Sequence, residues 1–573
     1  MNIPFHLKKY VVEQEHDNYT YIDHAVWRYI MKISISFFNH YAHSSYIDGI
    51  DKTGITIDSI PRVDNIDSNL EKFGWHAVCV RGFIPPKAFM EFQSLKILPI
   101  AADMRRIDNL TYTPAPDIVH ESAGHAPIII DEDYSEYLEA YGEVATNSII
   151  SVNDIEAYNL VRRISDLKED ESASIAEIED IENKLGVLLN STDNISEATE
   201  LTRMNWWTVE YGLVGDIKSP LIYGAGLLSS VGESQNCLSS RVKKIPFSLD
   251  CINYPYDITE QQPQLFVCKN FKELTSALNE YSNTMAYKVG GSIGLIKAVE
   301  AKTINTCKND IGLQITGKFS DVISNDGTPI YLQLSGPVQL SYNNIEINGH
   351  GGDYHSDGYG TVIGDLEGTD KPISMMDRSE LLAIGLYEDS LVNLNFKSGI
   401  KLIGRVDSIT YLEGYNAIIS FEDCSVSYND KKLFDPSWGR YDLVCSNSII
   451  SVYGGVADIS NYYKFIDYYE APTNKKSKGT QQGQNKDLEL LLKSVRWLRE
   501  NNSATDKELE YIYLNSINKK CNSWLLDFEI IELIKDMDSD FANKMVNRIR
   551  SLSNDDTDIS KSIRRGLRVY IGK

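Results

Sequence analysis

The segment TYTPAPDIVHESAGHAP (111–127) holds the residues whose types and spacing best suit chemistry. His120 and His125 lie five positions apart, and Glu121 directly follows the first histidine. Two neutral imidazoles and one carboxylate on one face of an iron(II) ion leave its other coordination positions open for dioxygen and substrate. A zinc protease instead uses two histidines four apart, with a glutamate as general base. On spacing alone, an iron site, a zinc hydrolase and a pair of ordinary surface histidines all stay open.

The same spacing predicts where the helix that carries the histidines ends. Five positions correspond to roughly 140° of rotation around an ideal α-helix, so the two side chains would not share a face of a continuing helix. Gly124, directly before His125, is a residue typical of helix ends. We therefore expect His125 at or beyond the end of the helix that begins near His120.

The spacing of apolar residues predicts a multi-domain protein. Up to about residue 300 they recur at intervals of three and four, as in 23–50 and 270–285, which is typical of amphipathic helices. Between about 308 and 470 apolar and polar residues alternate, which is typical of β-hairpins. A polar stretch and four short helical patterns follow. We predict a mainly α domain, an all-β domain, a flexible linker and a small C-terminal helical domain, at 1–300, 301–472, 473–486 and 487–573.

The stretch from about 152 to 198 differs from the rest of the first domain. It is charged, its only aromatic residue is Tyr158, and its apolar residues have helical spacing. We predict two exposed helices separated by the acidic run KEDES (168–172), forming a solvated surface insertion.

Composition bounds the class of protein and its partners. The formal net charge of −25 argues against nucleic acid and against an anionic membrane surface as partners. No stretch approaches the ~20 consecutive apolar residues that a membrane span needs. The eight cysteines are scattered without a CxxC pair, which fits a reducing compartment, and the N-terminus lacks the apolar core of a signal peptide. We expect a cytoplasmic protein and leave homo-oligomerisation open.

Four blocks, in order, resemble the signature regions of the pterin-dependent aromatic amino acid hydroxylases, a family that oxidises phenylalanine, tyrosine and tryptophan. They are TYTPAPDIVHESAGHAP (111–127), NWWTVEYGL (205–213), YGAGLLSSVGESQNCL (223–238) and YDITEQQPQLFV (256–267), within roughly residues 20–290. The resemblance implies that residues 1–300 form a mainly α catalytic domain of the aromatic amino acid hydroxylase type. It also implies that His120, His125 and Glu210 bind iron. Aromatic residues crowd Glu210, and a buried carboxylate needs a charged partner, either a metal or an ion pair.

The resemblance further implies residues for substrate and cofactor. The positions matched to substrate binding are Arg105, Thr113, Pro116, Trp206 and Ser229. Arginine suits a bidentate pair with an amino acid carboxylate, and the adjacent Arg106 could exchange roles with Arg105. The positions matched to the pterin are Gly82, Ile84, Phe89 and Glu121, with the Phe89 ring as stacking partner. The sequence departs from the family at Pro85 and Pro86, where the pterin loop has serines, and at Asn205, where it has an aromatic residue.

The implied reaction is ring hydroxylation of an aromatic amino acid by a monooxygenase that uses Fe(II), dioxygen as co-substrate, and a tetrahydropterin, either tetrahydrobiopterin or a related pterin. Trp206 favours phenylalanine or tyrosine as substrate, and Ile258 argues against tyrosine. The preferred expectation is L-phenylalanine to L-tyrosine. The alternatives are a tyrosine or tryptophan hydroxylase, a zinc-dependent hydrolase, and a non-catalytic protein that binds an aromatic amino acid.

The C-terminal half contains one further group of candidate ligands. The segment EINGHGGDYHSDGYGT (346–361) gathers His350, His355, Asp353 and Asp357 among glycines. These residues could hold a second metal ion, and a glycine-rich hairpin loop explains them as well. Oligomerisation, regulation and small-ligand binding all stay open as tasks for this half.

Overall fold

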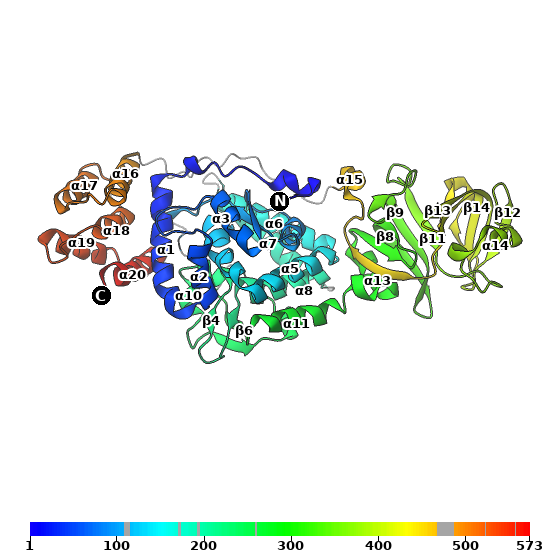
Figure 1. Ribbon diagram of the computed structural model, residues 1–573, viewed down its shortest axis with the longest axis horizontal. Helices are drawn as coiled ribbons and strands as arrows, with labels where there is room; N and C mark the ends of the chain where they lie inside the picture. Colours follow the sequence, from blue (N-terminus) through cyan, green and yellow to red (C-terminus); the bar gives the residue numbers. More distant parts are fainter. Residues whose placement is uncertain are drawn as a thin grey trace.

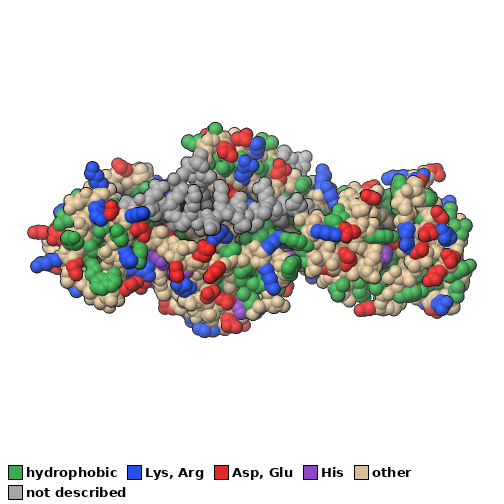
Figure 2. All heavy atoms as spheres, turned by 90° about the horizontal axis from the view of Figure 1, so that it is seen from above, with side chains coloured by type: hydrophobic (Ala, Val, Ile, Leu, Met, Phe, Trp, Pro, Cys, Tyr) green, Lys and Arg blue, Asp and Glu red, His purple; other side chains and the backbone are tan. Residues whose placement is uncertain are grey.

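The computed structural model describes residues 1–107, 110, 115–169, 173–191, 195–257, 261–466, 486–521, 523–555 and 557–572. Figure 1 shows a helical centre, a β-rich region at one end of the long axis, and the C-terminal helices at the other. The helical and β-rich parts that the sequence predicts are thus both present. On the face seen in Figure 2, acidic and basic side chains are interspersed. Within the described residues, no helix has the combination of length and hydropathy that a bilayer crossing requires.

The central region consists of helices around two small sheets. Its main helices are α1 (Tyr21–Tyr41), α2 (Ser44–Lys52), α3 (Val63–Leu70), α4 (Pro86–Ser94), α5 (Glu132–Asn147), α6 (Val152–Glu169), α7 (Ile175–Ser191), α8 (Glu197–Asn205), α9 (Ala225–Ser229), α10 (Glu233–Asn236), α11 (Phe271–Ser282), α12 (Ala286–Val289) and α13 (Gly291–Ala301). Two π-helices, η5 (Val119–His125) and η7 (Trp206–Glu210), interrupt this pattern. One sheet pairs β1 (His76–Val80) with β2 (Ile97–Ala101). The other has the order β4-β3-β6-β5, with bounds Leu221–Ile222, Leu213–Val214, Gln264–Cys268 and Lys243–Pro246.

The segment 23–50, predicted as one amphipathic helix, is two helices. A capping box between Thr20 and Asp23 starts α1, which ends at Tyr41. The chain then pairs with β4: Ala42 bridges Ile222, and the His43 N–H donates to the Ile222 carbonyl at 2.8 Å. Apolar spacing continues across this break, so periodicity alone did not locate it.

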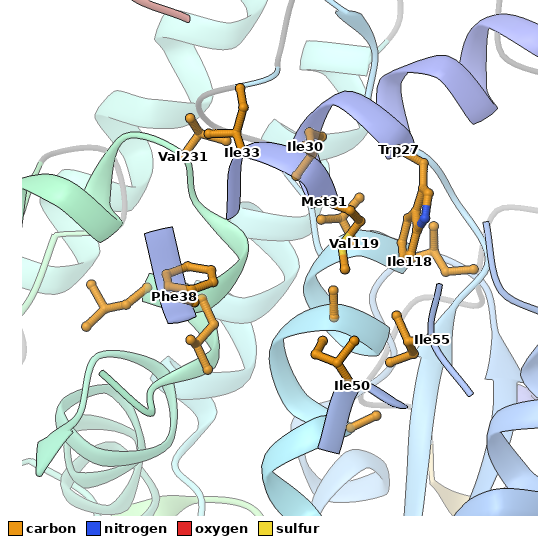
Figure 3. Close-up of a cluster of buried hydrophobic side chains, with 14 of the residues drawn as sticks. Trp27, Ile30, Met31, Ile33, Phe38, Ile50, Ile55, Ile118, Val119 and Val231 are labelled. Atoms are coloured by element: carbon orange, nitrogen blue, oxygen red, sulfur yellow. The ribbon is translucent and has the colours of Figure 1, made fainter. Parts of the chain in front are cut away.

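The buried face of α1 packs against the start of η5. Figure 3 shows Trp27, Ile30 and Met31 of α1 beside Ile118 and Val119, and all five side chains are buried. This contact matters for function because Val119 is the first residue of the π-helix that carries both histidines. The hydrophobic core therefore sets the position of the candidate site.

The β-rich region contains two antiparallel sheets. The first has the order β10-β9-β8-β7-β17, with β11 also paired to β9; in chain order the bounds are β7 (Ile304–Asn309), β8 (Leu313–Asn325), β9 (Thr328–Tyr342), β10 (Ile345–Glu346), β11 (Gly358–Val362) and β17 (Ile449–Gly454). The second has the order β12-β13-β14-β15, with β16 paired to β14; the bounds are β12 (Leu391–Asn395), β13 (Lys401–Leu412), β14 (Tyr415–Tyr428), β15 (Lys431–Phe434) and β16 (Tyr441–Val444). Two short helices, α14 (Arg378–Ala383) and α15 (Ile459–Tyr462), accompany them. Two hydrophobic clusters fill this region, and each contains buried side chains from both sheets.

The C-terminal helices pack on α1 and extend its core. They are α16 (Lys486–Glu500), α17 (Asp506–Asn518), α18 (Trp524–Ile531), α19 (Asp540–Ser551) and α20 (Asp558–Ile571), one more than the four predicted patterns. The Tyr29 ring contacts Trp524 and Phe528, and its hydroxyl donates to the Ser562 carbonyl at 2.6 Å. Their buried side chains therefore belong to one continuous cluster with those of α1. Most of the predicted linker, 473–486, lies outside the described residues.

Candidate metal centre

Three side chains from two distant segments converge on one point. The Nε2 atoms of His120 and His125 are 3.1 Å apart, and the Glu210 carboxylate oxygens lie 3.4 Å and 3.3 Å from them. Adjacent ligands on one metal ion are about 3 Å apart when the metal–ligand bonds are near 2.1 Å. The three side chains therefore have the separation that a shared metal ion requires, and their types are those of a two-histidine, one-carboxylate site.

The five-residue spacing of the histidines follows from the π-helical backbone of η5. A π-helix bonds residue i to i+5, so residues five apart lie about one turn from each other. In an α-helix the same two side chains would point away from one another. The helix does end at His125, as predicted, but the backbone is π-helical within it, which the sequence reasoning did not foresee.

Glu210 is positioned by a second π-helix. Helix α8 ends at Asn205 and η7 continues it to Glu210, where the Tyr211 N–H donates to the Trp206 carbonyl at 2.9 Å. The wider turn brings the carboxylate at its end to the two imidazoles. Both candidate ligand segments thus use the same unusual backbone, which is frequent at functional sites.

Glycines allow the segment after β4 to pack directly against both π-helices. A Cβ at Gly224 would lie 2.5 Å from the Glu210 carbonyl oxygen. A Cβ at Gly124 would lie 2.8 Å from the Ala225 carbonyl oxygen, so η5 and α9 also touch through their backbones. The Gly226 N–H donates to the Glu210 carboxylate. The YGAGLLSS block, which stood out as a family motif, is therefore the support that holds the two ligand segments together.

Ser229 orients the first histidine. Its Oγ donates to the Ala225 carbonyl at 2.8 Å and lies 2.9 Å from His120 Nδ1. Because the hydroxyl hydrogen is used by Ala225, the oxygen accepts a hydrogen bond from Nδ1–H. This places the lone pair of His120 on Nε2, toward Glu210 and His125. The sequence predicted Ser229 as a substrate residue, and the contact with His120 is an additional role.

Arg105 lies next to this group, held by an aspartate that the sequence reasoning passed over. Its guanidinium makes a bidentate pair with Asp117, at 2.8 Å for both Nε–Oδ2 and Nη2–Oδ1. Nη1 also donates to the Ser229 carbonyl at 3.0 Å. Asp117 accepts the His120 backbone N–H at 3.0 Å, so one carboxylate fixes the arginine and the start of η5. The sequence signal for this role was the position of Asp117 in the segment PDI (116–118), just before the helix.

Burial and mutual charge set the protonation of the cluster. Burial opposes ionisation of Glu210, but the imidazoles of His125 and His120 outweigh it and hold its pKa at about 2. Burial lowers the pKa of His120 to about 4. Burial acts against the charged form of His125, but Glu210 outweighs it and raises its pKa. An ionised carboxylate beside imidazoles is the donor set that a divalent transition metal binds.

Glu121 is a fourth acidic group at the edge of the cluster. Its Oε2 lies 4.0 Å from His125 Nε2, farther than either oxygen of Glu210 lies from a histidine. Among the described residues this buried oxygen has no hydrogen-bond partner, and burial raises the pKa of the carboxyl to about 8. The distances favour Glu210 as the third metal ligand and leave Glu121 oriented for another group.

The remaining predicted substrate residues are placed as follows. The Trp206 ring is stacked between the rings of Tyr211 and Tyr256, at centroid distances of 4.5 Å and 4.2 Å. Pro116 is half-buried and directly precedes Asp117. Thr113 lies outside the described residues, as does Ile258. Trp206 is thus the first residue of η7 and Pro116 lies just before η5, and their contact with substrate stays a prediction.

The predicted pterin loop lies after β1. Gly82 has a positive φ of 57° and its N–H donates to Asp103 at 3.1 Å. Ile84 is buried in a small cluster of apolar side chains, and Phe89 packs against that cluster. Pro85 caps α4 and Pro86 is its first residue, which is a position that tolerates proline. The assignment of Gly82, Ile84 and Phe89 to the pterin stays a prediction.

Comparison with known proteins defines the class. Residues 8–156 and 176–292 match the family of biopterin-dependent aromatic amino acid hydroxylases, and these ranges include both histidines and Glu210. The matched ranges make up just under half of the chain, and within them the chain is similar to this family. Of the unmatched residues, 157–169 lie in α6 and Ile175 is the first residue of α7, inside the predicted insertion.

Individual relatives carry more specific names. The chain is 28% identical over 272 residues to phenylalanine-4-hydroxylase of Mesorhizobium japonicum, covering 47% of this chain and 82% of the relative. It is 27% identical over 278 residues to the phenylalanine-4-hydroxylase of Pseudomonas aeruginosa, covering 48% and 89%. Among solved structures, Chromobacterium violaceum phenylalanine hydroxylase with bound oxidised Fe(III) is 26% identical, with a TM-score of 0.37 and coverage of 47% of this chain and 84% of that chain.

Proposed function

We propose that this protein is an iron(II)- and tetrahydropterin-dependent monooxygenase that converts L-phenylalanine to L-tyrosine with dioxygen as co-substrate. The observation that carries the proposal is the convergence of His120, His125 and Glu210 within 3.1–3.4 Å. Relatives named phenylalanine-4-hydroxylase support phenylalanine as the substrate.

The donor set fits iron. Nε2 of each histidine and the carboxylate of Glu210 would hold the ion, leaving its remaining positions for other groups. When bound, iron together with a reduced pterin supplies the activation of dioxygen that ring hydroxylation requires. The protein orients His120 through Ser229 and Asp117, buries His125, and leaves the side chains of His120 and Glu210 only 17% exposed.

Arg105 is suited to hold the substrate carboxylate. The hydrogen bonds to Asp117 and to the Ser229 carbonyl use three of the five N–H groups of a guanidinium. Because Asp117 holds the group rigidly, little side-chain freedom is lost when a carboxylate binds. Asp117, which accepts the backbone N–H of His120, therefore also positions Arg105, the proposed substrate anchor.

The buried, unpartnered oxygen of Glu121 fits a ligand beside the metal. We assign Glu121 to the pterin, either tetrahydrobiopterin or a related pterin, together with Gly82, Ile84 and Phe89. Substitution Glu121→Gln should therefore raise the KM for pterin while the protein still binds iron. Substitution Glu210→Gln should instead lose the iron. The contrast separates the two carboxylates in one experiment.

The activity is tested by anaerobic reconstitution with Fe(II), followed by addition of oxygen, tetrahydrobiopterin and one aromatic amino acid at a time. We expect tyrosine from phenylalanine, dependent on the pterin, and no product when Zn²⁺ replaces iron. If the iron-loaded protein forms no pterin-dependent product from phenylalanine, tyrosine or tryptophan, the proposal is wrong. A product from tyrosine or tryptophan alone would mean that the enzyme hydroxylates that amino acid and not phenylalanine.

The substrate anchor is tested by the pair Arg105→Lys and Arg106→Lys. Lysine keeps the charge but loses the bidentate geometry, so Arg105→Lys should raise the KM for phenylalanine roughly tenfold or more. Arg106→Lys is the matched control in the next residue and should leave this KM unchanged. The reverse result in steady-state kinetics would assign the anchor to Arg106.

A further inference from the structure

A second buried cluster of ligand-type side chains lies in the β-rich region, far from the hydroxylase site in the sequence. His350, His355 and Asp442 are 8%, 7% and 3% exposed, and one potential ligand atom from each lies within 4.8 Å of the others. His350 Nδ1 is 3.4 Å from His355 Nε2, and both nitrogens are 4.0 Å from Asp442 Oδ2. Two imidazoles and a carboxylate thus face a common point here as well.

The two sheets supply different members of the cluster. Both histidines lie in the loop between β10 and β11 of the first sheet, whereas Asp442 lies in β16 of the second. The sequence reasoning considered Asp353 and Asp357 as partners of the histidines. Asp353 is instead mostly exposed and pairs with Lys464, so the carboxylate of the cluster comes from a strand that local spacing could not indicate.

The loop that carries the histidines is held by strand β9. The Leu340 N–H donates to the His350 carbonyl at 2.9 Å, and the Val338 N–H donates to the His355 carbonyl at 3.1 Å. A Cβ at Gly351 would lie 2.4 Å from a carboxylate oxygen of Glu346, so the loop passes close to this side chain. The histidine backbones are therefore fixed before any ion binds.

Other contacts orient the carboxylate and the rings. The Ser420 hydroxyl donates to Asp442 Oδ1, and the Tyr354 hydroxyl also bonds this carboxylate. The His355 ring makes edge contacts with Tyr354 and Tyr359, at centroid distances of 4.6 Å and 5.0 Å. Supporting hydrogen bonds and an apolar surround of this kind are typical of metal sites.

Hydrogen bonding does not link the Asp442 carboxylate to the two imidazoles. The 4.0 Å from Asp442 Oδ2 to each ring nitrogen is too long for a hydrogen bond, although the groups face one another. Ligands in a tetrahedral site with bonds near 2.1 Å are about 3.4 Å apart, which is the separation of the two nitrogens. The Asp442 oxygen, at 4.0 Å from each nitrogen, would move closer to them when an ion binds. Burial also lowers the pKa of both histidines, and neutral imidazole is the form that binds metals.

We propose that His350, His355 and Asp442 bind a divalent first-row transition-metal ion that joins the two sheets of the β-rich region. Imidazole with one carboxylate suits zinc, iron, nickel and copper, so Zn²⁺ serves as the probe. The ion would connect the β10–β11 loop to β16 and so stabilise the contact between the sheets. The proposal does not depend on the hydroxylase activity.

The test uses the full chain with the substitutions His120→Ala and His125→Ala, which remove the first cluster. After dialysis against Zn²⁺ and removal of free metal, elemental analysis should find one ion per chain. Adding Asp442→Asn should weaken zinc binding at least tenfold in a chelator competition. Adding Asp353→Asn, the matched control in the loop that carries the two histidines, should leave zinc binding unchanged. Equal binding by the Asp442→Asn and Asp353→Asn proteins overturns the assignment.

Thermal unfolding gives a second readout that does not need the Asp442 variant to be well folded. Zinc should raise the melting temperature of the double-histidine variant and of its Asp353→Asn derivative. Adding His355→Gln should abolish the increase. If the double-histidine variant itself binds no zinc and melts at the same temperature with and without it, there is no second site.

Discussion

At the scale of single residues, the metal centre depends on groups that do not touch the metal. Ser229 is the clearest case, because its Oγ receives Nδ1–H of His120 and so directs Nε2 toward the other ligands. Removing such an orienting partner typically weakens metal affinity 10–100-fold. We therefore expect Ser229→Ala to lower the affinity for Fe(II) within this range, measured by competition with a chelator.

The control for this prediction is Ser234→Ala. Ser234 is also buried, but its hydroxyl donates to the Val231 carbonyl at 3.4 Å and makes no contact with a ligand. Ser234→Ala should therefore leave the affinity for Fe(II) unchanged. Equal losses in the two variants would mean that the effect comes from packing rather than from the hydrogen bond to His120.

Asp527 provides a prediction about pH. It pairs with Arg548 at 2.8 Å, but burial outweighs the pair and raises the pKa of the carboxyl from 3.8 to about 6. The folded state therefore binds this proton more tightly than the unfolded state, and the stabilisation is lost as pH rises through 6. From pH 5 to pH 7 the loss should be about 1 kcal/mol. Asp527→Asn removes this pH-dependent stabilisation. The change in the free energy of urea unfolding between pH 5 and pH 7 should therefore differ by about 1 kcal/mol between the variant and the parent protein.

The comparison between pH 5 and pH 7 cancels the constant cost of replacing the Asp527 side chain. Asp538→Asn, an exposed residue beyond the same helix, should show the pH dependence of the parent protein. If Asp527→Asn also follows the parent at both pH values, Asp527 does not titrate in this range in the folded protein.

At the scale of elements, the close contact of backbones fixes the two π-helices. A Cβ at Gly224 would overlap the carbonyl of Glu210, so Gly224→Ala must displace η7 or the segment before α9. We expect a loss of about 1–3 kcal/mol in the free energy of unfolding and a loss of iron, measured by urea denaturation and elemental analysis. Gly186 in α7 has open space at its Cβ position, so Gly186→Ala should be neutral or slightly stabilising. Full iron binding by the Gly224→Ala protein would contradict this account of the motif.

Much at this scale could be predicted from local spacing. The helical and β-rich parts follow from periodicity, whereas spacing alone left the metal site open and the resemblance to the hydroxylase family predicted His120, His125 and Glu210 as ligands. The break at Ala42–His43 could not be predicted, because it depends on pairing with β4. The π-helical turn of η5 likewise depends on packing of Gly124 against α9, and an α-helical interpretation placed the histidines apart. Contacts between distant segments, such as Asp442 with His355, leave no local pattern.

At the scale of the whole molecule, the C-terminal helices are joined to the hydroxylase region by a buried ion cluster as well as by the shared core. Arg28 of α1 pairs with Glu529 at 3.1 Å and with Glu532 at 2.8 Å, and the side chains of Arg28 and Glu529 are 3% and 4% exposed. Arg499 of α16 also pairs with Glu529. Unfolding of these helices would leave the buried Arg28 with Asp58 as its one remaining carboxylate partner among those the structure describes, and would expose the apolar face of α1. We infer that the two regions unfold together.

Substitution Glu529→Gln tests this coupling. Breaking a buried ion pair by removing one partner costs about 3–5 kcal/mol, so the temperature at which hydroxylase activity is lost should fall by several degrees. The matched control is Glu422→Gln, because the side chains of Glu422 and its partner Arg405 are 42% and 41% exposed and such a surface pair contributes little to stability. Helix content followed by circular dichroism should fall at the same temperature as activity. If Glu529→Gln leaves the temperature of activity loss unchanged while the helices melt earlier, the C-terminal helices are an independent domain, and the continuous core with α1 does not couple them to the active site.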